Sequence, residues 1–192
     1  MLEVYTYIRD NVSIIGISGA AGSGKDHVAK THFVEARGYK NVSFAWDFKI
    51  ETVAKGSAGY DEVFVTKPPR VRRLLQLIGT EQGRNLWGQD IWIDHAFCWM
   101  KLWHMEWGID KFIVPDVRFP NEATSIQKAG GKVFRVVSNQ AHNNMIERDV
   151  AHASETSLSD DDPLFDGIIN NDLYDGVWSD SSLMVRVLMD EF

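Results

Sequence analysis

The feature that most constrains this chain is a short apolar run followed at once by a glycine-rich stretch and a lysine. Residues 14–18 are typical of a buried strand, because the run is rich in isoleucine. Gly, Ala and Ser follow up to Gly24-Lys25, and the next segment carries apolar residues at helical spacing. A strand, a glycine loop and a helix form the context in which such a loop binds phosphate.

The backbone N–H groups of this loop are predicted to hold the phosphates of a nucleotide. The start of the following helix adds partial positive charge, and Lys25 is expected to reach the β and γ phosphates. The predicted nucleotide-binding residues are Gly19, Ala20, Ala21, Gly22, Ser23, Gly24, Lys25, Asp26 and His27.

Two acidic residues are candidate metal ligands. Asp26 stands where Ser or Thr follows the lysine in the common motif, and a carboxylate oxygen is a ligand that Mg²⁺ prefers. The alternative for Asp26 is that it caps a helix. Asp116 ends the predicted strand 111–116, and an aspartate in that place commonly holds Mg²⁺ beside a phosphate loop. The sequence therefore predicts ATP and Mg²⁺ as cofactors.

Composition limits the partners and the location. The formal net charge of −7 argues against duplex nucleic acid or an anionic membrane as the main partner, whereas a local basic pocket suffices for a nucleotide. The single cysteine, Cys98, permits no internal disulfide. The first ten residues are too charged for a signal peptide, and no apolar run reaches membrane-spanning length. We expect a cytoplasmic protein whose 192 residues form one domain.

Residues 69–84 are predicted to form a helix that begins at a proline. Four of its polar residues recur at a spacing of three or four and therefore share a face. These residues are Arg73, Gln76, Thr80 and Arg84. In an acidic chain this face fits either a phosphate clamp or a solvent-exposed surface. The clamp is favoured, because Gly79 and Gly83 indicate that another group approaches closely.

The other segments add further expectations. Lys49 follows the predicted strand 41–45, and this position is equally compatible with a lysine that binds a ligand and with a solvated lysine. An aromatic helix runs to about Gly108, and its Trp99, Trp103, Met105 and Trp107 are expected to pack in the core rather than to stack on bases. The tryptophans leave room for a dimer surface, so the sequence is compatible with either a monomer or a homodimer.

The remaining segments are interpreted more briefly. Residues 56–69 are predicted to be a loop, residues 138–155 a flexible cover, and residues 181–189 a C-terminal helix. The acidic run 160–162 precedes a proline and is interpreted as a solvated loop. His95 and His104 lack a set of Cys and His partners at metal-ligand spacing, so a zinc site is not expected.

Several segments, in order from about residue 14 to residue 171, resemble the deoxynucleoside monophosphate kinases of bacteriophages. They are Gly22-Ser23-Gly24-Lys25-Asp26, Phe44-Ala45 with Lys49, Arg73-x2-Gln76-x2-Gly79-Thr80-Glu81-x2-Arg84, Asp90-x-Trp92, Asp116-Val117-Arg118-Phe119-Pro120-Asn121-Glu122, Gly130-Gly131, His152-Ala153-Ser154-Glu155 and Phe165-Asp166 with Asn170. The resemblance implies a three-layer α/β P-loop kinase fold, with a central, mostly parallel sheet flanked by helices.

The same resemblance implies transfer of the ATP γ-phosphate to a deoxynucleoside 5′-monophosphate, in the host cytoplasm if a phage encodes the chain. It assigns catalysis to Lys25, Asp116 and Arg118, and metal binding to Asp26 and Asp116. It assigns acceptor binding to Lys49, Arg73, Gln76, Thr80, Arg84 and Trp92. A helical part at about 46–108 would bind the acceptor, and residues 138–156 would form a lid.

The chain departs from the family pattern at two places. Trp46 and Asp47 stand where the family usually has an acidic or small residue followed by proline. Ser138 and Asn139 stand where the family often carries an arginine, which makes Arg148 the candidate lid arginine.

Two other functions remain open from the residues alone. One is a P-loop kinase for another acceptor, such as dephospho-coenzyme A or a small alcohol, with Asp116 as general base. The other is a P-loop ATPase that acts as a switch or motor. A GTPase switch is disfavoured, because the chain lacks an Asp-x-x-Gly element and an Asn/Thr-Lys-x-Asp base reader.

Overall fold

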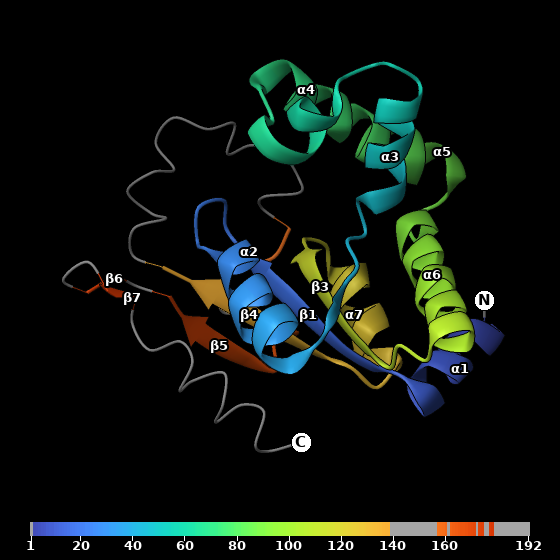
Figure 1. Cartoon of the computed structure of the whole chain (residues 1–192), viewed down its shortest axis with the longest axis vertical. Coiled ribbons are helices and arrows are strands. Elements are labelled where there is room, and N and C mark those ends of the chain that lie inside the picture. The colour runs from blue at the N-terminus through green and yellow to red at the C-terminus, as the bar shows by residue number, and fades with distance from the viewer. Residues whose placement is uncertain (1, 139–156, 161, 172, 175–176, 179–192) are drawn as a thin grey trace.

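The computed structural model describes residues 2–138, 157–160, 162–171, 173–174 and 177–178. A five-stranded sheet with the strand order β2-β3-β1-β4-β5 forms its centre (Figure 1). The strands are β1 (Ser13–Gly19), β2 (Lys40–Asn41), β3 (Lys111–Val117), β4 (Lys132–Val137) and β5 (Gly167–Asn170). All four neighbouring pairs are parallel, which confirms the expected α/β fold with a parallel sheet.

Helices precede and separate these strands, and two of them continue into wider π-helical turns, labelled η. They are α1 (Leu2–Asn11), α2 (Lys25–Val28) with η1 (Ala29–Glu35), α3 (Trp46–Ala54), η2 (Glu62–Thr66), α4 (Pro69–Gln76) with η3 (Leu77–Arg84) and α5 (Asn85–Trp87), α6 (Ile91–Trp107) and α7 (Pro120–Lys128). A separate antiparallel pair consists of β6 (Leu173–Tyr174) and β7 (Val177–Trp178).

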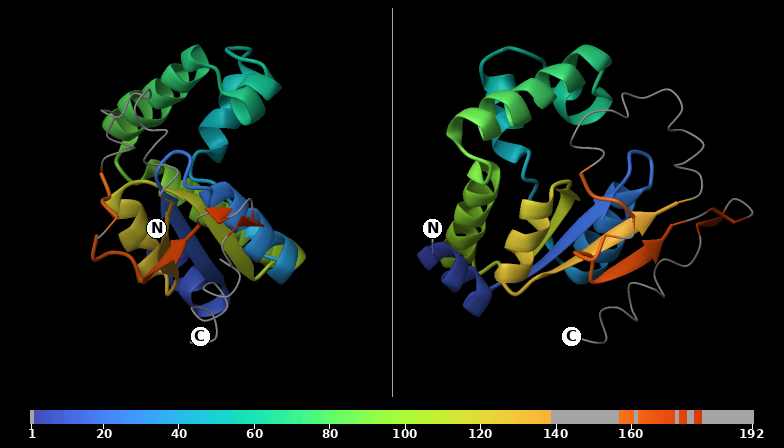
Figure 2. Two further views of the ribbon diagram at one scale, coloured as in Figure 1. Left: turned by 90° about the vertical axis from the view of Figure 1, so that its left-hand side faces the viewer. Right: turned by 180° about the vertical axis from the view of Figure 1, so that it is seen from behind.

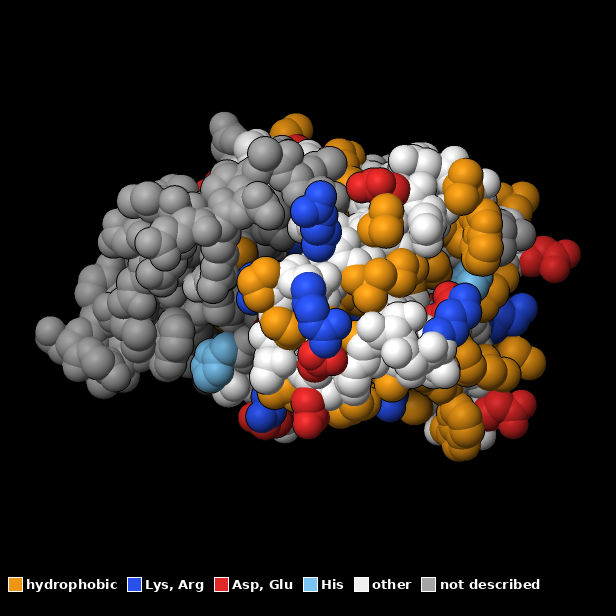
Figure 3. Space-filling model, turned by 90° about the horizontal axis from the view of Figure 1, so that it is seen from above, with side chains coloured by type: hydrophobic (Ala, Val, Ile, Leu, Met, Phe, Trp, Pro, Cys, Tyr) orange, Lys and Arg blue, Asp and Glu red, His pale blue; other side chains and the backbone are white. Residues whose placement is uncertain are grey.

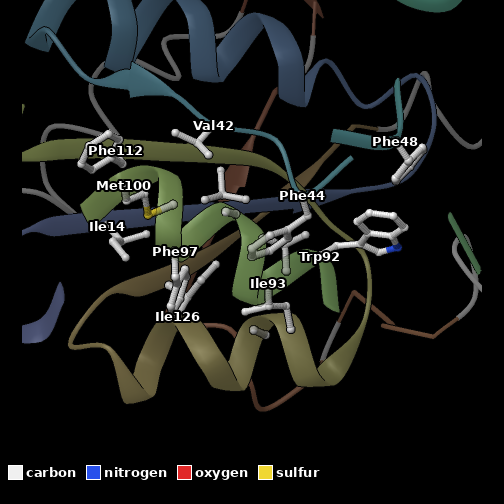
Figure 4. Close-up of a cluster of buried hydrophobic side chains, with 14 of the residues drawn as sticks. Ile14, Val42, Phe44, Phe48, Trp92, Ile93, Phe97, Met100, Phe112 and Ile126 are labelled. Carbon is white, nitrogen blue, oxygen red and sulfur yellow. The ribbon is translucent and has the colours of Figure 1, made fainter. Parts of the chain in front are cut away.

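The sheet is buried on both faces, as a parallel sheet requires. Successive side chains of β1 point to opposite faces, so Ile14 joins the cluster under α6 and α7, whereas Ile15 joins the cluster under α2 and η1. Figure 4 shows the first cluster, in which Phe97, Met100 and Ile126 lie against the sheet. Helix α1 packs beside α6, where the Tyr5 and Phe97 rings lie 4.9 Å apart.

Between β2 and β3 the chain leaves the sheet and forms α3, η2, α4, η3, α5 and α6. Helices α3 to α5 lie beyond the edge at which β1 and β3 end (Figures 1 and 2). In a parallel sheet the carboxyl ends of the strands share one edge, where ligands bind. The fold therefore brings the glycine loop after β1, the Asp116 end of β3 and the helical part together.

The structure corrects two expectations about local structure. The strand expected at 41–45 comprises only Lys40–Asn41, because the next residues turn away toward Asp116. The loop expected at 56–69 contains the helical turns of η2 (Glu62–Thr66). The lid at 138–156, its candidate Arg148 and the helix at 181–189 lie outside the described residues, apart from Ser138.

The aromatic helix α6 is only partly a core element. Trp103 stacks over Phe112 with ring centroids 6.2 Å apart, and the indole N–H of Trp99 donates to Asp47. Trp107 and Met105 are 66% and 62% exposed, so the expectation that they pack in the core is wrong. Both follow the last buried residue of the helix, Met100, toward its C-terminal end.

Candidate active site

A cleft of about 760 Å³ lies between the glycine loop and the helical part. Six basic and three acidic side chains line it. They are Lys25, Lys49, Lys67, Arg72, Arg84 and Arg118, with Asp26, Asp116 and Glu122. Figure 3 views the molecule from the side of the helical part, where basic side chains lie among apolar ones. The cleft is cationic in a chain of net charge −7, so it suits an anionic ligand.

The glycine loop forms one wall. Ala21, Gly22, Lys25 and Asp26 line the cleft, whereas Gly19, Ala20, Ser23, Gly24 and His27 do not. Gly22 and Gly24 have positive φ angles of 88° and 79°, a conformation that glycine adopts without strain. No atom lies within 4 Å of the place where a side chain at Gly22 would begin, so the backbone here is open to a ligand.

A residue that the sequence analysis did not single out holds the loop from behind. The Asn171 side-chain amide, fully buried after β5, donates a hydrogen bond to the Ser23 carbonyl at 2.9 Å. The neighbouring Asn170, and not Asn171, belongs to the family pattern. Within the described residues, the buried Ser23 Oγ and Asn171 Oδ1 have no hydrogen-bond partner.

Asp116 lies at the edge of the sheet, as expected, and lines the cleft. Its carboxylate accepts hydrogen bonds from the Ser43 hydroxyl, the Phe44 N–H at 3.0 Å and the Ala45 N–H at 3.1 Å. These bonds hold the segment that leads into α3. Among the described residues no group of three or more His, Cys, Asp or Glu side chains is placed to enclose a metal.

Lys49 lines the cleft from α3, next to this segment. Burial lowers the pKa of its ammonium group, and the nearby Asp116 opposes the shift. The structure therefore favours the ligand-facing interpretation of Lys49 over the solvated one.

The wide turns of η3 form the opposite wall. Side chains of Gln76, Thr80 and Arg84 line the cleft, whereas Arg73 is exposed and does not. Arg72 lies there instead, and its Nε donates to the Lys67 carbonyl at 2.7 Å. Neither Lys67 nor Arg72 could be assigned to the cleft from the sequence, because their place there depends on how η2 and α4 dock.

Gly79 and Gly83 do mark a close approach, and the approaching groups are aromatic. A methyl group added at Gly79 would lie 2.9 Å from Phe48 Cζ, and one at Gly83 would lie 2.3 Å from Trp92 Cζ2. The Trp92 indole N–H donates to the Gly79 carbonyl at 2.7 Å. Figure 4 shows Phe48 and Trp92 side by side. Trp92, predicted as an acceptor ligand, lines the cleft and is only 5% exposed.

Arg84 has a buried partner. One of its terminal nitrogens pairs with Glu122, the other donates to the Gln89 carbonyl at 2.8 Å, and the guanidinium lies 4.1 Å from the Phe119 ring centre. Burial raises the pKa of the Glu122 carboxyl to about 7, against the opposing effect of Arg84. These contacts use only part of the guanidinium's five N–H donors.

Asp47, one of the two departures from the family pattern, fixes α3 to α6. Its carboxylate lies 2.6 Å from His95 Nδ1 and accepts the Trp99 indole N–H at 3.0 Å. The helix α3 therefore begins at Trp46 without a proline, because two side chains of α6 hold its first turn.

The family model described as deoxynucleotide monophosphate kinase matches residues 57–175, which is more than half of the chain. The chain belongs to this family. The deoxynucleotide monophosphate kinases are phosphotransferases, so the protein is an enzyme that phosphorylates a deoxynucleotide monophosphate. No curated protein matches the chain.

The match to the kinase family leaves out the glycine-loop wall of the cleft. It includes Gln76, Thr80, Arg84, Asp116 and Arg118 and begins after the glycine loop and Lys49. No helix in the described part of this kinase is both long and apolar enough to cross a bilayer.

Proposed function

We propose that this kinase transfers the γ-phosphate of ATP, with Mg²⁺, to a deoxynucleoside 5′-monophosphate. The observation that carries the proposal is the shared cleft. The glycine loop with Lys25 forms one wall of it, and the polar face of Gln76, Thr80 and Arg84 forms the other. Two phosphate-bearing ligands that enter from these walls would meet between them.

On the donor side, the open backbone at Gly22 and the positive-φ glycines fit the phosphates of ATP. Lys25 would stabilise charge on the transferring group. Asp26 and Asp116 would hold Mg²⁺, which would offset the negative charge of the phosphates. Each of the two carboxylates lines the cleft.

On the acceptor side, Arg84 with Gln76 and Thr80 would hold the acceptor phosphate, and Lys49 would supply a further charge from α3. Arg118 would bridge the donor and acceptor phosphates at the end of β3. The acceptor is already an anion and needs no general base. The helical part at about 46–108 would therefore be the acceptor-binding part of a single kinase domain.

A small alcohol acceptor is disfavoured by the bonding of Asp116. Such an acceptor needs a general base, and Asp116 is the candidate. Its Oδ2 already accepts the Ser43 hydroxyl and the Ala45 N–H, and its Oδ1 accepts the Phe44 N–H, so a single acceptor position remains, on Oδ1. Where that position serves Mg²⁺, none is left for a general base.

The experiment is coupled ADP release with ATP and dAMP, dGMP, dCMP, dTMP or modified pyrimidine monophosphates, beside dephospho-coenzyme A. We expect turnover with at least one deoxynucleoside monophosphate and no ATP hydrolysis without acceptor. Lys25→Ala should lose about 10²-fold or more in kcat. Lys30→Ala, which removes an exposed lysine paired with Glu35, is the matched control and should match the wild type. If Lys25→Ala turned over as fast as the wild type, the assignment of the donor site would be refuted.

A further inference from the structure

One buried carboxylate joins the two sides of the cleft. Glu122 is 3% exposed and lies in the first turn of α7. Its Oε1 pairs with Arg84 of η3, on the acceptor wall. Its Oε2 accepts the backbone N–H groups of Arg118 at 2.6 Å and Phe119 at 3.0 Å, directly after β3.

Arg84 is held as tightly as its partner. Its side chain is 4% exposed, one terminal nitrogen donates to the Gln89 carbonyl, and Phe119 covers the guanidinium plane. Phe119 therefore belongs to both groups, because its N–H bonds to Glu122 and its ring packs on Arg84. A shift of η3 would move Arg84, the carboxylate and the backbone at residues 118–119 together.

We propose that Glu122 is a positioning residue that fixes Arg84 and the backbone at Arg118 to each other, so that one contact sets the spacing of the two phosphate-binding arginines. The functional consequence rests on the proposed kinase mechanism. The link itself, formed by the contacts of Glu122 with Arg84 and with the backbone at residues 118–119, does not depend on that mechanism. It can be tested without substrate.

The chemistry suits a positioning role better than a catalytic one. Each carboxylate oxygen already accepts at least one hydrogen bond, so little capacity remains for a ligand. The charged groups that act on Glu122 are Arg84 from η3 and Asp116 from β3. Removing one partner of a buried ion pair leaves the other uncompensated, which makes the contact sensitive to substitution.

The first test is hydrogen–deuterium exchange at the amides of Arg118 and Phe119 in the full chain without ligand. Arg84→Lys keeps the charge but removes the planar fork, and we expect it to speed exchange at both amides by about tenfold. Arg70→Lys is the matched control, because Arg70 pairs with the exposed Glu62 outside the cleft, and it should change neither amide. Wild-type exchange at both amides in a folded Arg84→Lys variant would overturn the link.

The second test is a double-mutant cycle in kcat/KM with the four deoxynucleoside monophosphates assayed singly. Arg84→Lys and Glu122→Gln should each raise the acceptor KM and leave ADP affinity unchanged. The double variant should lose no more than the worse single variant, because both act through one contact. If the fold losses in kcat/KM of the two single variants multiply in the double variant, the proposal is contradicted.

Glu122→Asp decides the question if Arg84→Lys does not fold. It keeps the charge but shortens the side chain, so we expect faster amide exchange and a raised acceptor KM together. Unchanged amide exchange would refute the link, and an unchanged acceptor KM would refute its effect on the acceptor site. If the wild type phosphorylates none of the four acceptors, the proposed function fails while the exchange result still stands. If turnover occurs and exchange does not respond to Arg84→Lys, the inference alone fails.

Discussion

The amide of Asn171 holds the carbonyl of Ser23 at 2.9 Å, which ties the glycine loop to the end of β5. The Asn171 backbone N–H in turn donates to Val137 of β4 at 2.9 Å. The loop is therefore braced by two strands that lie behind it. Because the brace does not touch the cleft, its effect on ligand binding is separable from direct contact.

Replacing Asn171 by Ala should weaken donor binding through the loop. A lost hydrogen bond to a buried carbonyl costs about 1–2 kcal/mol, which corresponds to roughly 5- to 30-fold weaker ADP binding if the whole cost falls on the loop. Calorimetric titration with ADP measures this change. Asn11→Ala, which removes an exposed amide bonded to Tyr7, is the control and should bind ADP as the wild type does.

Replacing Gly83 by Ala should destabilise the fold. The new methyl group would lie 2.3 Å from Trp92, and overpacking of this kind costs about 1–3 kcal/mol. We expect a lower Tm in thermal unfolding. At Gly59 an added methyl group would find its nearest atom 3.5 Å away, at Glu62, so Gly59→Ala should leave Tm nearly unchanged. A Gly83→Ala variant as stable as Gly59→Ala would count against the packing described for η3.

Activity should fall on the alkaline side at a pH below the usual pKa of lysine. Burial lowers the pKa of Lys49, so this side chain loses its proton, and with it its charge, earlier than an exposed lysine. Arginine stays charged throughout this range, so Lys49→Arg should move the alkaline limb of kcat/KM for the acceptor to higher pH. Identical limbs in the two proteins would show that Lys49 is not the titrating group.

Stability should depend on pH through Glu122. Its pKa is about 7 in the folded chain against 4.5 for the ordinary carboxyl, so the folded state binds more protons between these values. The free energy of unfolding contributed by this group is therefore fully present below pH 4.5 and is lost as pH rises through about 7, by on the order of 3 kcal/mol. Urea unfolding of the wild type and Glu122→Gln across pH 4.5–7.5 should differ in slope, with a flatter dependence in the variant.

The local patterns of the sequence predicted most of the fold and brought the glycine loop and Asp116 to one edge of the sheet. The glycine loop and the strand before it are continuous in the chain, and Asp116 could be placed at the sheet edge because its strand is a plain apolar run. The close approach at Gly79 and Gly83 was also predictable, since glycine leaves room. The groups that contact these glycines could not be predicted, because Phe48 and Trp92 come from two other helices.

The acceptor side depends on contacts between distant residues, which periodicity does not reveal. Arg84 and Glu122 meet although they lie 38 positions apart. Arg72 lines the cleft in place of Arg73, which depends on how α4 docks beside it. The short β2 follows from Asp116, whose carboxylate binds the 43–45 segment and draws it out of the sheet.

The excursion between β2 and β3 has a consequence for how such enzymes diverge. These two strands are hydrogen-bonded neighbours, so the points at which the chain departs and returns are close together. Lengthening, shortening or exchanging the intervening helices leaves the strand order and the phosphate loop as they are. An exchange of these helices would therefore replace the wall proposed to bind the acceptor and keep the glycine loop unchanged.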